Sequence, residues 1–138
     1  MKKNTYIFSY GTLQEEFVQK TIFKRKIDMI DAKLENFVIF ADSTPYFGII
    51  PSKDNEIYGK ILEITEDELK LCDLWEDTPA LYQREIYEVF ANNLLYKVWI
   101  YNKKPNGEFK VIKTPTKTNS NLDKFIKDLQ EFINKINK

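Results

Sequence analysis

The segment from Arg84 to Tyr101 constrains the fold most, because its pattern is that of a β-hairpin turning at Asn92-Asn93. Two asparagines tolerate the positive φ angles that a tight type I′ turn requires. The arm after the turn, LLYKVWIY, is apolar on both faces apart from Lys97. This arm predicts either a central strand that is covered on both sides or one strand of a small barrel.

Other segments also have the composition and alternation of strands. They are residues 5–10, which end at Gly11, residues 32–40, with a bend expected near Asn36, residues 57–64, and a short edge strand at 109–112. Gly59 lies inside the third of these and marks a bulge or a close approach of two backbones. A short apolar segment at 46–50 precedes a polar cluster at 52–55, which is typical of a turn.

Three segments favour helices. The first opens after Gly11, with an apolar face of Phe17, Val18, Ile22 and Phe23. The second begins at the S/T-x-x-E capping box Thr65-Glu66-Asp67-Glu68 and turns Leu69, Cys72 and Trp75 inward, and Pro79 prevents its continuation. The third covers about residues 121–137, where apolar residues recur at helical spacing, and we expect this amphipathic helix to pack on its own domain. Residues 114–121, which contain Pro115, are expected to form a linker before it.

Composition narrows the function classes. The 138 residues suit one domain, and 21 basic and 21 acidic side chains give no net charge that would favour nucleic acid or an anionic membrane as a partner. The chain has no histidine, and Cys72 is its only cysteine, so zinc sites and Ser-His or Cys-His pairs are excluded. No disulfide can form within the chain, and the apolar run near the start is too short for a signal core or a membrane span. These features predict a cytoplasmic protein.

Two features of the sequence could form a catalytic or binding site. Glu76 lies at the end of the second helix beside Trp75, with Tyr82 following, and a carboxylate in apolar surroundings tends to have the raised pKa of a proton-transfer catalyst. The turn Tyr10-Gly11-Thr12-Leu13 presents backbone N–H groups, which suit a carboxylate or an oxyanion. The alternatives are an ordinary solvated helix end and a plain strand-to-helix connection.

Taken in order, these motifs resemble the γ-glutamylcyclotransferase-like family, in particular its small γ-glutamylamine cyclotransferase type. The resemblance rests on Tyr10-Gly11-Thr12-Leu13, on Cys72-Asp73-Leu74-Trp75-Glu76 and on Tyr82-Gln83-Arg84. It is supported by Pro45, Gly48, the 58–64 strand and Trp99-Ile100-Tyr101, and it covers about residues 5–101. The chain departs from the family pattern at Cys72, where leucine is usual, and at Asp77, where glycine usually follows the catalytic Glu.

The resemblance implies an α+β fold: a small mixed, partly closed β-barrel with short helices and the C-terminal amphipathic helix, as a single domain over 1–138 with its core at about 5–113. It implies intramolecular aminolysis of a γ-glutamyl compound to 5-oxoproline, with Glu76 as general acid/base and without metal or cofactor. Substrate-binding roles are implied for the turn residues and one later aromatic residue, namely Tyr10, Gly11, Thr12, Leu13 and Tyr82. Asp73 is expected to be structural, with Arg84 as a candidate partner, and Asp77 is expected to raise the pKa of Glu76 or to reshape the mouth of the pocket.

Two alternatives remain open. The same fold could serve as a non-catalytic domain that binds a small ligand, since fold does not fix function. A cyclotransferase could also act on glutathione or on γ-glutamyl amino acids, because the pocket for the leaving group is not identifiable from the sequence. In each case the partner is a small molecule, and the sequence makes no prediction of oligomeric state.

Overall fold

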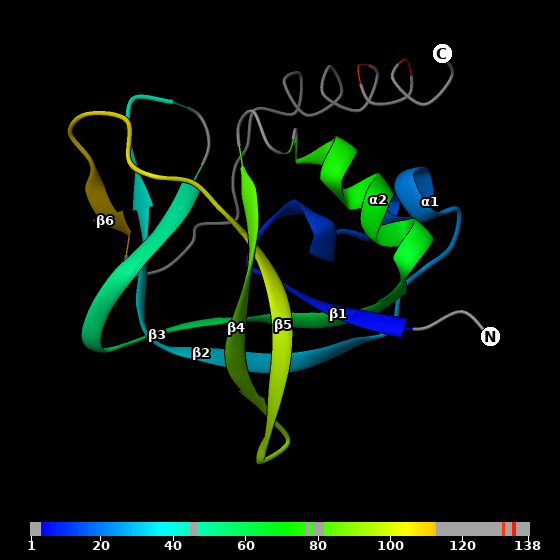
Figure 1. Ribbon diagram of the computed structural model, residues 1–138, viewed down its shortest axis with the longest axis horizontal. Helices are drawn as coiled ribbons and strands as arrows, with labels where there is room; N and C mark the ends of the chain where they lie inside the picture. The colour runs from blue at the N-terminus through cyan, green and yellow to red at the C-terminus, as the bar shows by residue number, and fades with distance from the viewer. Residues whose placement is uncertain are drawn as a thin grey trace.

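The computed structural model describes residues 4–44, 47–76, 78, 82–112, 131 and 134. Along this part of the chain the elements are β1 (Asn4–Ser9), a 3₁₀ turn η1 (Thr12–Gln14), α1 (Glu16–Phe23), β2 (Met29–Ala41), β3 (Phe47–Thr65), α2 (Glu66–Trp75), β4 (Gln83–Ala91), β5 (Leu94–Asn102) and β6 (Lys110–Ile112). Figure 1 shows α1 and α2 side by side at one end of the strands, with the tip of the β4–β5 hairpin pointing away from them.

The strands form one mixed sheet that closes on itself. Its order is β3-β1-β5-β4-β2-β6, and β2 also pairs with β3, so that five strands make a ring and β6 stays at an edge. The β1–β5 pairing is parallel, through Ile7 and Trp99, and the other pairings are antiparallel. The α+β architecture with a mixed, closing sheet, expected from the sequence, is therefore confirmed.

The turn expected at residues 52–55 is wrong, because the chain continues through it as one strand of 19 residues, β3. In the β2–β3 ladder Glu35 pairs with Glu56 and Phe37 pairs with Pro51, so residues 52–55 face Asn36 alone. Asn36 and Asp54 adopt positive φ angles of 67° and 64°, and the Asp54 N–H donates to Asn36 Oδ1 at 3.2 Å. The polar cluster thus forms a bulge between two halves of a long ladder, and the bend expected at Asn36 is confirmed.

The hairpin is confirmed with its turn at Asn92 and Asn93, whose φ angles are 51° and 63°. Its second arm is not covered on both sides along its whole length, since Leu94 and Leu95 are 59% and 52% exposed. Only the later half of β5, where Val98 and Ile100 are buried, enters the core. Of the two structures left open for this arm, a strand of a closed ring is the one observed.

The capping box forms as predicted at the start of α2. The Glu68 N–H donates to Thr65 Oγ1 at 3.2 Å, and the Thr65 N–H donates back to the Glu68 carboxylate at 2.9 Å. Arg25, just beyond α1, donates to both oxygens of the same carboxylate at 2.8 Å. Glu68 therefore satisfies the first turn of α2 and also joins it to the end of α1.

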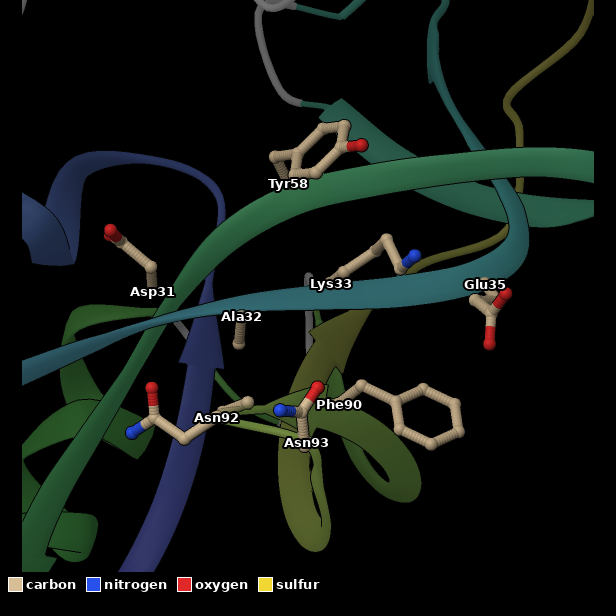
Figure 2. Close-up of a pocket in the computed structure, with 9 residues that line it drawn as sticks. Asp31, Ala32, Lys33, Glu35, Tyr58, Phe90, Asn92 and Asn93 are labelled. Atoms are coloured by element: carbon tan, nitrogen blue, oxygen red, sulfur yellow. The ribbon is translucent and has the colours of Figure 1, made fainter.

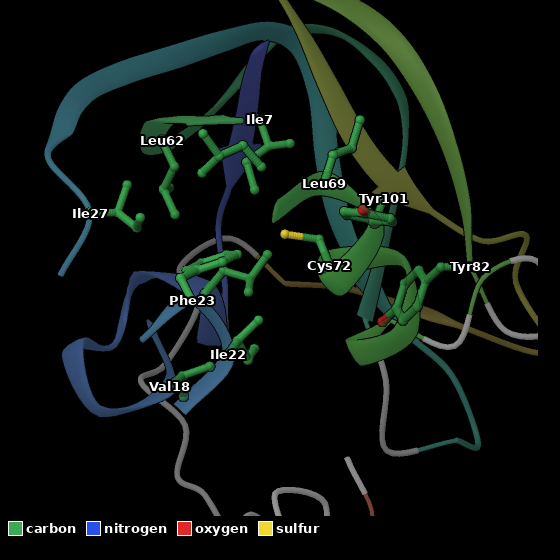
Figure 3. Close-up of a cluster of buried hydrophobic side chains, with 12 residues drawn as sticks. Ile7, Val18, Ile22, Phe23, Ile27, Leu62, Leu69, Cys72, Tyr82 and Tyr101 are labelled. Carbon is green, nitrogen blue, oxygen red and sulfur yellow. The ribbon is translucent and has the colours of Figure 1, made fainter. Parts of the chain in front are cut away.

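One of two buried clusters lies between the helices and the sheet. Figure 3 shows Ile22 and Phe23 of α1 and Cys72 of α2 converging with Ile7 and Leu62 from the strands. The expected apolar face of the first helix is correct for Val18, Ile22 and Phe23 but wrong for Phe17, which is 49% exposed. The α-helix begins at Glu16 rather than directly after Gly11, and the inward position next to Val18 is taken by Gln19.

The buried Gln19 side chain is fully used in hydrogen bonds. Its amide nitrogen donates to the carbonyl oxygen of Leu13 at 2.8 Å, and its amide oxygen accepts from the N–H of Ile27 at 2.9 Å. Because Leu13 ends the turn after β1 and Ile27 precedes β2, this one amide connects the backbones at both ends of α1.

The linker expected at residues 114–121, Pro79 and the amphipathic helix expected at 121–137 lie outside the described ranges, apart from positions 131 and 134, so these predictions stay untested. Within the part of the chain that the structure describes, no helix is long and apolar enough to span a membrane.

The close backbone approach expected at Gly59 is confirmed and gives a first test. A Cβ atom there would lie 2.5 Å from the carbonyl oxygen of Ser9, whereas a Cβ atom on Gly11 would meet nothing within 4 Å. We expect Gly59→Ala to lower the free energy of unfolding by about 1–3 kcal/mol, as overpacking does. Urea unfolding followed by circular dichroism measures this loss, with Gly11→Ala as the matched control, and equal stability of the two variants would contradict the packing of β3 on β1.

Candidate functional site

The turn that follows β1 is held by its own side chains. The Gly11 N–H donates to Ser9 Oγ at 3.2 Å, and the Gln14 side chain donates to the carbonyl oxygen of Ser9. The N–H of Gln14 also donates to the carbonyl oxygen of Gly11 at 3.2 Å, which starts the short 3₁₀ turn. These bonds fix the direction in which the peptide groups of residues 10–13 point.

Gly11 has an open surrounding. Its φ is −142°, and a Cβ atom added there would meet nothing within 4 Å. Within the residues that the structure describes, the N–H groups of Thr12 and Leu13 have no hydrogen-bond acceptor. An exposed glycine next to two N–H groups without acceptors leaves this turn free to accept an anionic or carbonyl oxygen from outside.

The second half of the site is the end of α2, where Glu76 caps the helix. Its N–H donates to the carbonyl oxygen of Cys72 at 2.9 Å, and its φ and ψ of −85° and 1° leave the helical conformation. The preceding residue, Trp75, donates from its indole Nε1 to Thr12 Oγ1 at 3.2 Å. This bond joins residues that are 63 positions apart and brings the end of α2 to the turn after β1.

The Glu76 carboxyl group is desolvated by burial. The side chain is partly buried, and no ion pair or side-chain hydrogen bond to it occurs within the described ranges. Desolvation raises its pKa from an ordinary 4.5 to about 8. A group with a pKa near neutrality can both take and release a proton at physiological pH, which is the property expected from the sequence.

Two tyrosine phenols, those of Tyr10 and Tyr101, lie close enough to Glu76 for its negative charge to raise their pKa values. Burial raises the pKa of the Tyr10 phenol, and the nearby Glu76 carboxylate raises it further. Burial likewise raises the pKa of the Tyr101 phenol, to which Cys72, Asp73 and Glu76 add. Both phenols thus keep their protons and can serve only as neutral hydrogen-bond donors or acceptors near the carboxyl group.

Asp73, one helical turn before Glu76, is paired as the sequence suggested. Arg84 of β4 donates from Nε to Asp73 Oδ1 at 2.7 Å and from Nη2 to Oδ2 at 3.1 Å. The Tyr101 hydroxyl donates to Oδ1 at 2.7 Å, and the guanidinium lies 4.4 Å from the centre of the Trp99 ring. The pairing of Asp73 with Arg84 is confirmed, and it fastens the last turn of α2 to the β4–β5 hairpin.

Two further residues singled out in the sequence lie in the core. Tyr82 is 8% exposed, belongs to the cluster between helices and sheet, and donates from its hydroxyl to the carbonyl oxygen of Phe47 at 2.7 Å. Its role toward a substrate stays a prediction. Cys72 is fully buried, and burial raises the pKa of its thiol well above the usual range, which confirms it as a small core residue rather than a reactive thiol.

Asp77 lies outside the described residues, so its expected effect on Glu76 is untested.

A groove of about 440 Å³ lies elsewhere on the molecule, around Asp31, Lys33, Tyr58, Asn92 and Asn93. Figure 2 shows Asp31 and Lys33 on β2, Tyr58 on β3, and Asn92 and Asn93 at the tip of the β4–β5 hairpin. Neither Glu76 nor the turn after β1 lines it. Of the charged side chains that line it, Asp31 pairs with Lys60 and Lys33 pairs with Glu56, and Glu35 is the third. In the described part of the chain no group of three or more Cys, Asp or Glu side chains could hold a metal ion.

Comparisons with known proteins show similarity in sequence and in fold. Residues 7–121 match the family model described as gamma-glutamyl cyclotransferase, AIG2-like. Over 96 residues the chain is 34% identical to AIG2-like protein C of Arabidopsis thaliana, covering 68% of this chain and 55% of that protein. Over 107 residues it is 33% identical to a Methanocaldococcus jannaschii protein named gamma-glutamylcyclotransferase and putative RNase, covering 75% and 48%.

A solved structure shows the same fold. The crystal structure of an AIG2-like protein from Mus musculus superimposes with a TM-score of 0.63 at 22% sequence identity, covering 75% of this chain and 80% of that one. The chain spans about half the length of the two curated relatives named above, so the activities of those whole proteins are not carried over to it.

The Asp73 network gives a stability prediction. Asp73→Asn should lower the free energy of unfolding by about 1.5–3 kcal/mol, because it removes charge-assisted hydrogen bonds from Arg84. Chemical denaturation of the variant measures the loss. Glu88→Gln, at an exposed position of the same hairpin, is the matched control and should change stability by about 0.5 kcal/mol or less. An equal effect of the two substitutions would show that the network does not hold α2 in place.

The raised pKa of Glu76 predicts a pH dependence of stability. Since the folded state keeps the proton up to about pH 8 and the unfolded state loses it near 4.5, the wild type should lose stability as pH rises from 4.5 to 8. Glu76→Gln cannot ionise and should be spared this loss. Thermal unfolding of both proteins from pH 4 to 9 should show that the Tm of the variant, relative to that of the wild type, increases as pH rises from 4.5 to 8. A difference in Tm that does not change with pH would mean that the carboxyl group is not desolvated.

Proposed function

Since the chain belongs to the AIG2-like gamma-glutamyl cyclotransferase family, we propose that it is a cyclotransferase that converts a γ-glutamyl amine or a related γ-glutamyl compound into 5-oxoproline and a free amine. The observation that carries the proposal is a single carboxyl group, Glu76, with a pKa of about 8. This group follows directly on the residue that contacts the turn after β1.

The reaction needs a group that moves protons. At neutral pH the α-amine of a γ-glutamyl compound is protonated and cannot attack a carbonyl carbon. The Glu76 carboxylate takes a proton from this amine, whose nitrogen then forms a bond to the γ-carbonyl carbon and closes a five-membered ring. The bond from that carbon to the leaving nitrogen breaks as the protonated Glu76 gives its proton to the departing nitrogen. The ring nitrogen gives up its second proton to the Glu76 carboxylate, which passes it to the released amine. The products are 5-oxoproline and an ammonium ion, so atoms and charges balance without a covalent enzyme intermediate.

The turn supplies the complementary electrostatics. The N–H groups of Thr12 and Leu13, which have no acceptor in the described part of the chain, would donate to the substrate carboxylate or to the oxyanion that forms on the γ-carbonyl oxygen. The open space beside Gly11 gives such an oxygen access to them. Tyr10 keeps its phenolic proton and would donate a hydrogen bond to the substrate beside the turn. Tyr82, held in the core by its bond to the Phe47 carbonyl oxygen, is the further aromatic residue that we propose to line the substrate site.

Two features of the proposal rest on the sequence and the family. We propose a cytoplasmic location, which the single cysteine, unable to form a disulfide within the chain, favours. The preference for γ-glutamyl amines over glutathione or γ-glutamyl amino acids follows from the resemblance to the γ-glutamylamine cyclotransferase type. The experiment below tests the second of these directly.

We expect the protein to form 5-oxoproline from at least one of γ-glutamyl-ε-lysine, γ-glutamyl-alanine and glutathione, with the highest kcat/KM for the first. Glu76→Gln keeps the shape of the side chain but cannot accept a proton, so kcat should fall by about 10²–10⁴-fold. Initial rates of 5-oxoproline formation, measured by chromatography over a range of substrate concentrations, give kcat and kcat/KM.

Glu88→Gln is the control for the loss of one surface carboxylate and should be as active as the wild type. Absence of 5-oxoproline with all three compounds, together with saturable binding of one of them, would support a ligand-binding domain instead. Full activity of Glu76→Gln would remove Glu76 from the mechanism.

A further inference from the structure

The two halves of the candidate site come from distant parts of the chain. The turn belongs to the end of β1, and Glu76 belongs to the end of α2. Of the polar contacts described between them, the hydrogen bond from Trp75 Nε1 to Thr12 Oγ1 is the direct one. Each half is braced separately, the turn by Ser9 and Gln14 and the helix end by Asp73 and Arg84.

This bond lies next to both groups that the reaction would use. On one side, a peptide bond joins Trp75 to Glu76, so the indole and the carboxyl group are attached to adjacent Cα atoms. On the other side, the Thr12 hydroxyl belongs to a residue whose own N–H has no acceptor in the described part of the chain. The Trp75–Thr12 bond therefore restrains the separation of the carboxyl group from the peptide N–H groups more directly than any contact within either half.

The bond is also easy to break without disturbing the core. Thr12 is exposed, and Trp75 is only partly buried where it packs against the cluster between helices and sheet. Removing the indole N–H alone leaves an aromatic ring for that packing. A hydrogen bond at such a position contributes little to stability, but it can still align two elements that hold reacting groups.

We propose that Trp75 is a positioning residue, which holds the turn after β1 in register with Glu76 through its hydrogen bond to Thr12. This inference rests on the proposed function, since it assigns the bond to the alignment of the general acid/base with the oxygen-binding N–H groups. It adds a residue that acts through Thr12 rather than by touching the substrate.

A double-mutant cycle on activity tests the proposal. Trp75→Phe removes the donor and Thr12→Val removes the acceptor while each keeps much of its shape. Each single variant should lower kcat about 3- to 10-fold, the size of one neutral hydrogen bond, with little change in KM or in Tm. The double variant should be no worse than either single one, because the same bond is lost only once. Losses that multiply, or losses seen in Tm rather than in kcat, would overturn the positioning role.

Fluorescence gives a readout that does not depend on turnover. The chain has two tryptophans, so Trp99→Phe leaves Trp75 as the sole indole. In that background Thr12→Val should shift the emission maximum of Trp75, because the indole N–H loses its acceptor. Trp99→Phe by itself should keep the wild-type kcat, since Trp99 contacts Arg84 and not the turn. An unchanged emission maximum would show that the bond does not form in solution and would overturn the inference.

The two failures are distinguishable. If the wild type forms no 5-oxoproline while Thr12→Val shifts the emission of Trp75, the proposed function is overturned, and the catalytic positioning role falls with it although the bond is present. If the wild type is active but the cycle is additive, only the positioning role of Trp75 is overturned.

Discussion

The long strand β3 is the element on which the other parts depend. Its first half pairs with β2 and its second half pairs with both β2 and β1, so that one segment of 19 residues closes the ring. Its last residue, Thr65, is also the N-cap of α2. The direction in which α2 leaves the sheet is thus set by the end of β3, and the position of Glu76 eleven residues later follows from it. The close contact of Gly59 with Ser9 fixes the same strand against the start of the turn. Both halves of the candidate site therefore depend on β3: α2 follows it directly in the chain, and β1, which leads into the turn, pairs with it.

Three carboxylates on α2 show how the surroundings set the role of a side chain. Glu68 accepts two hydrogen bonds from Arg25, which holds its pKa below the ordinary value, and it stabilises the start of the helix. Asp73 accepts from Arg84 and Tyr101 and fastens the last turn. Glu76 has no such partner in the described part of the chain, and burial raises its pKa. The same chemical group thus serves twice for structure and once, in our proposal, for proton transfer.

Local patterns in the sequence predicted local structure well. The capping box at Thr65 and the Asn92-Asn93 turn each depend on a few neighbouring residues, and both are confirmed. The glycine at position 59 predicted a close approach, which is confirmed, but it could not name the distant Ser9 as the residue approached. The prediction failed where distant pairing decides the outcome. Residues 52–55 have the composition of a turn, but the ladder with β2 holds them in one strand with a bulge. Phe17 was placed in the core because it is apolar, but Val18, Gln19, Ile22 and Phe23 form the buried face of α1 and Phe17 lies outside it. For the candidate site, the order of the motifs predicted roles for Glu76 and the turn, and these roles stay predictions. No local signal could name Thr12 as the partner of the Trp75 indole.

The unpartnered carboxyl group has an energetic consequence for the whole molecule. At neutral pH a carboxyl group with a pKa of about 8 in the folded protein lowers the free energy of unfolding, because the group ionises more readily once unfolding exposes it to water. Asp73, one helical turn earlier, is instead bound by Arg84 of β4 and by the Tyr101 hydroxyl. The end of α2 thus combines a carboxylate that fastens the helix to the β4–β5 hairpin with a carboxyl group that has no such partner in the described part of the chain. Strongly perturbed pKa values of this kind gather at functional sites, which is why the second group rather than the first is our candidate for proton transfer.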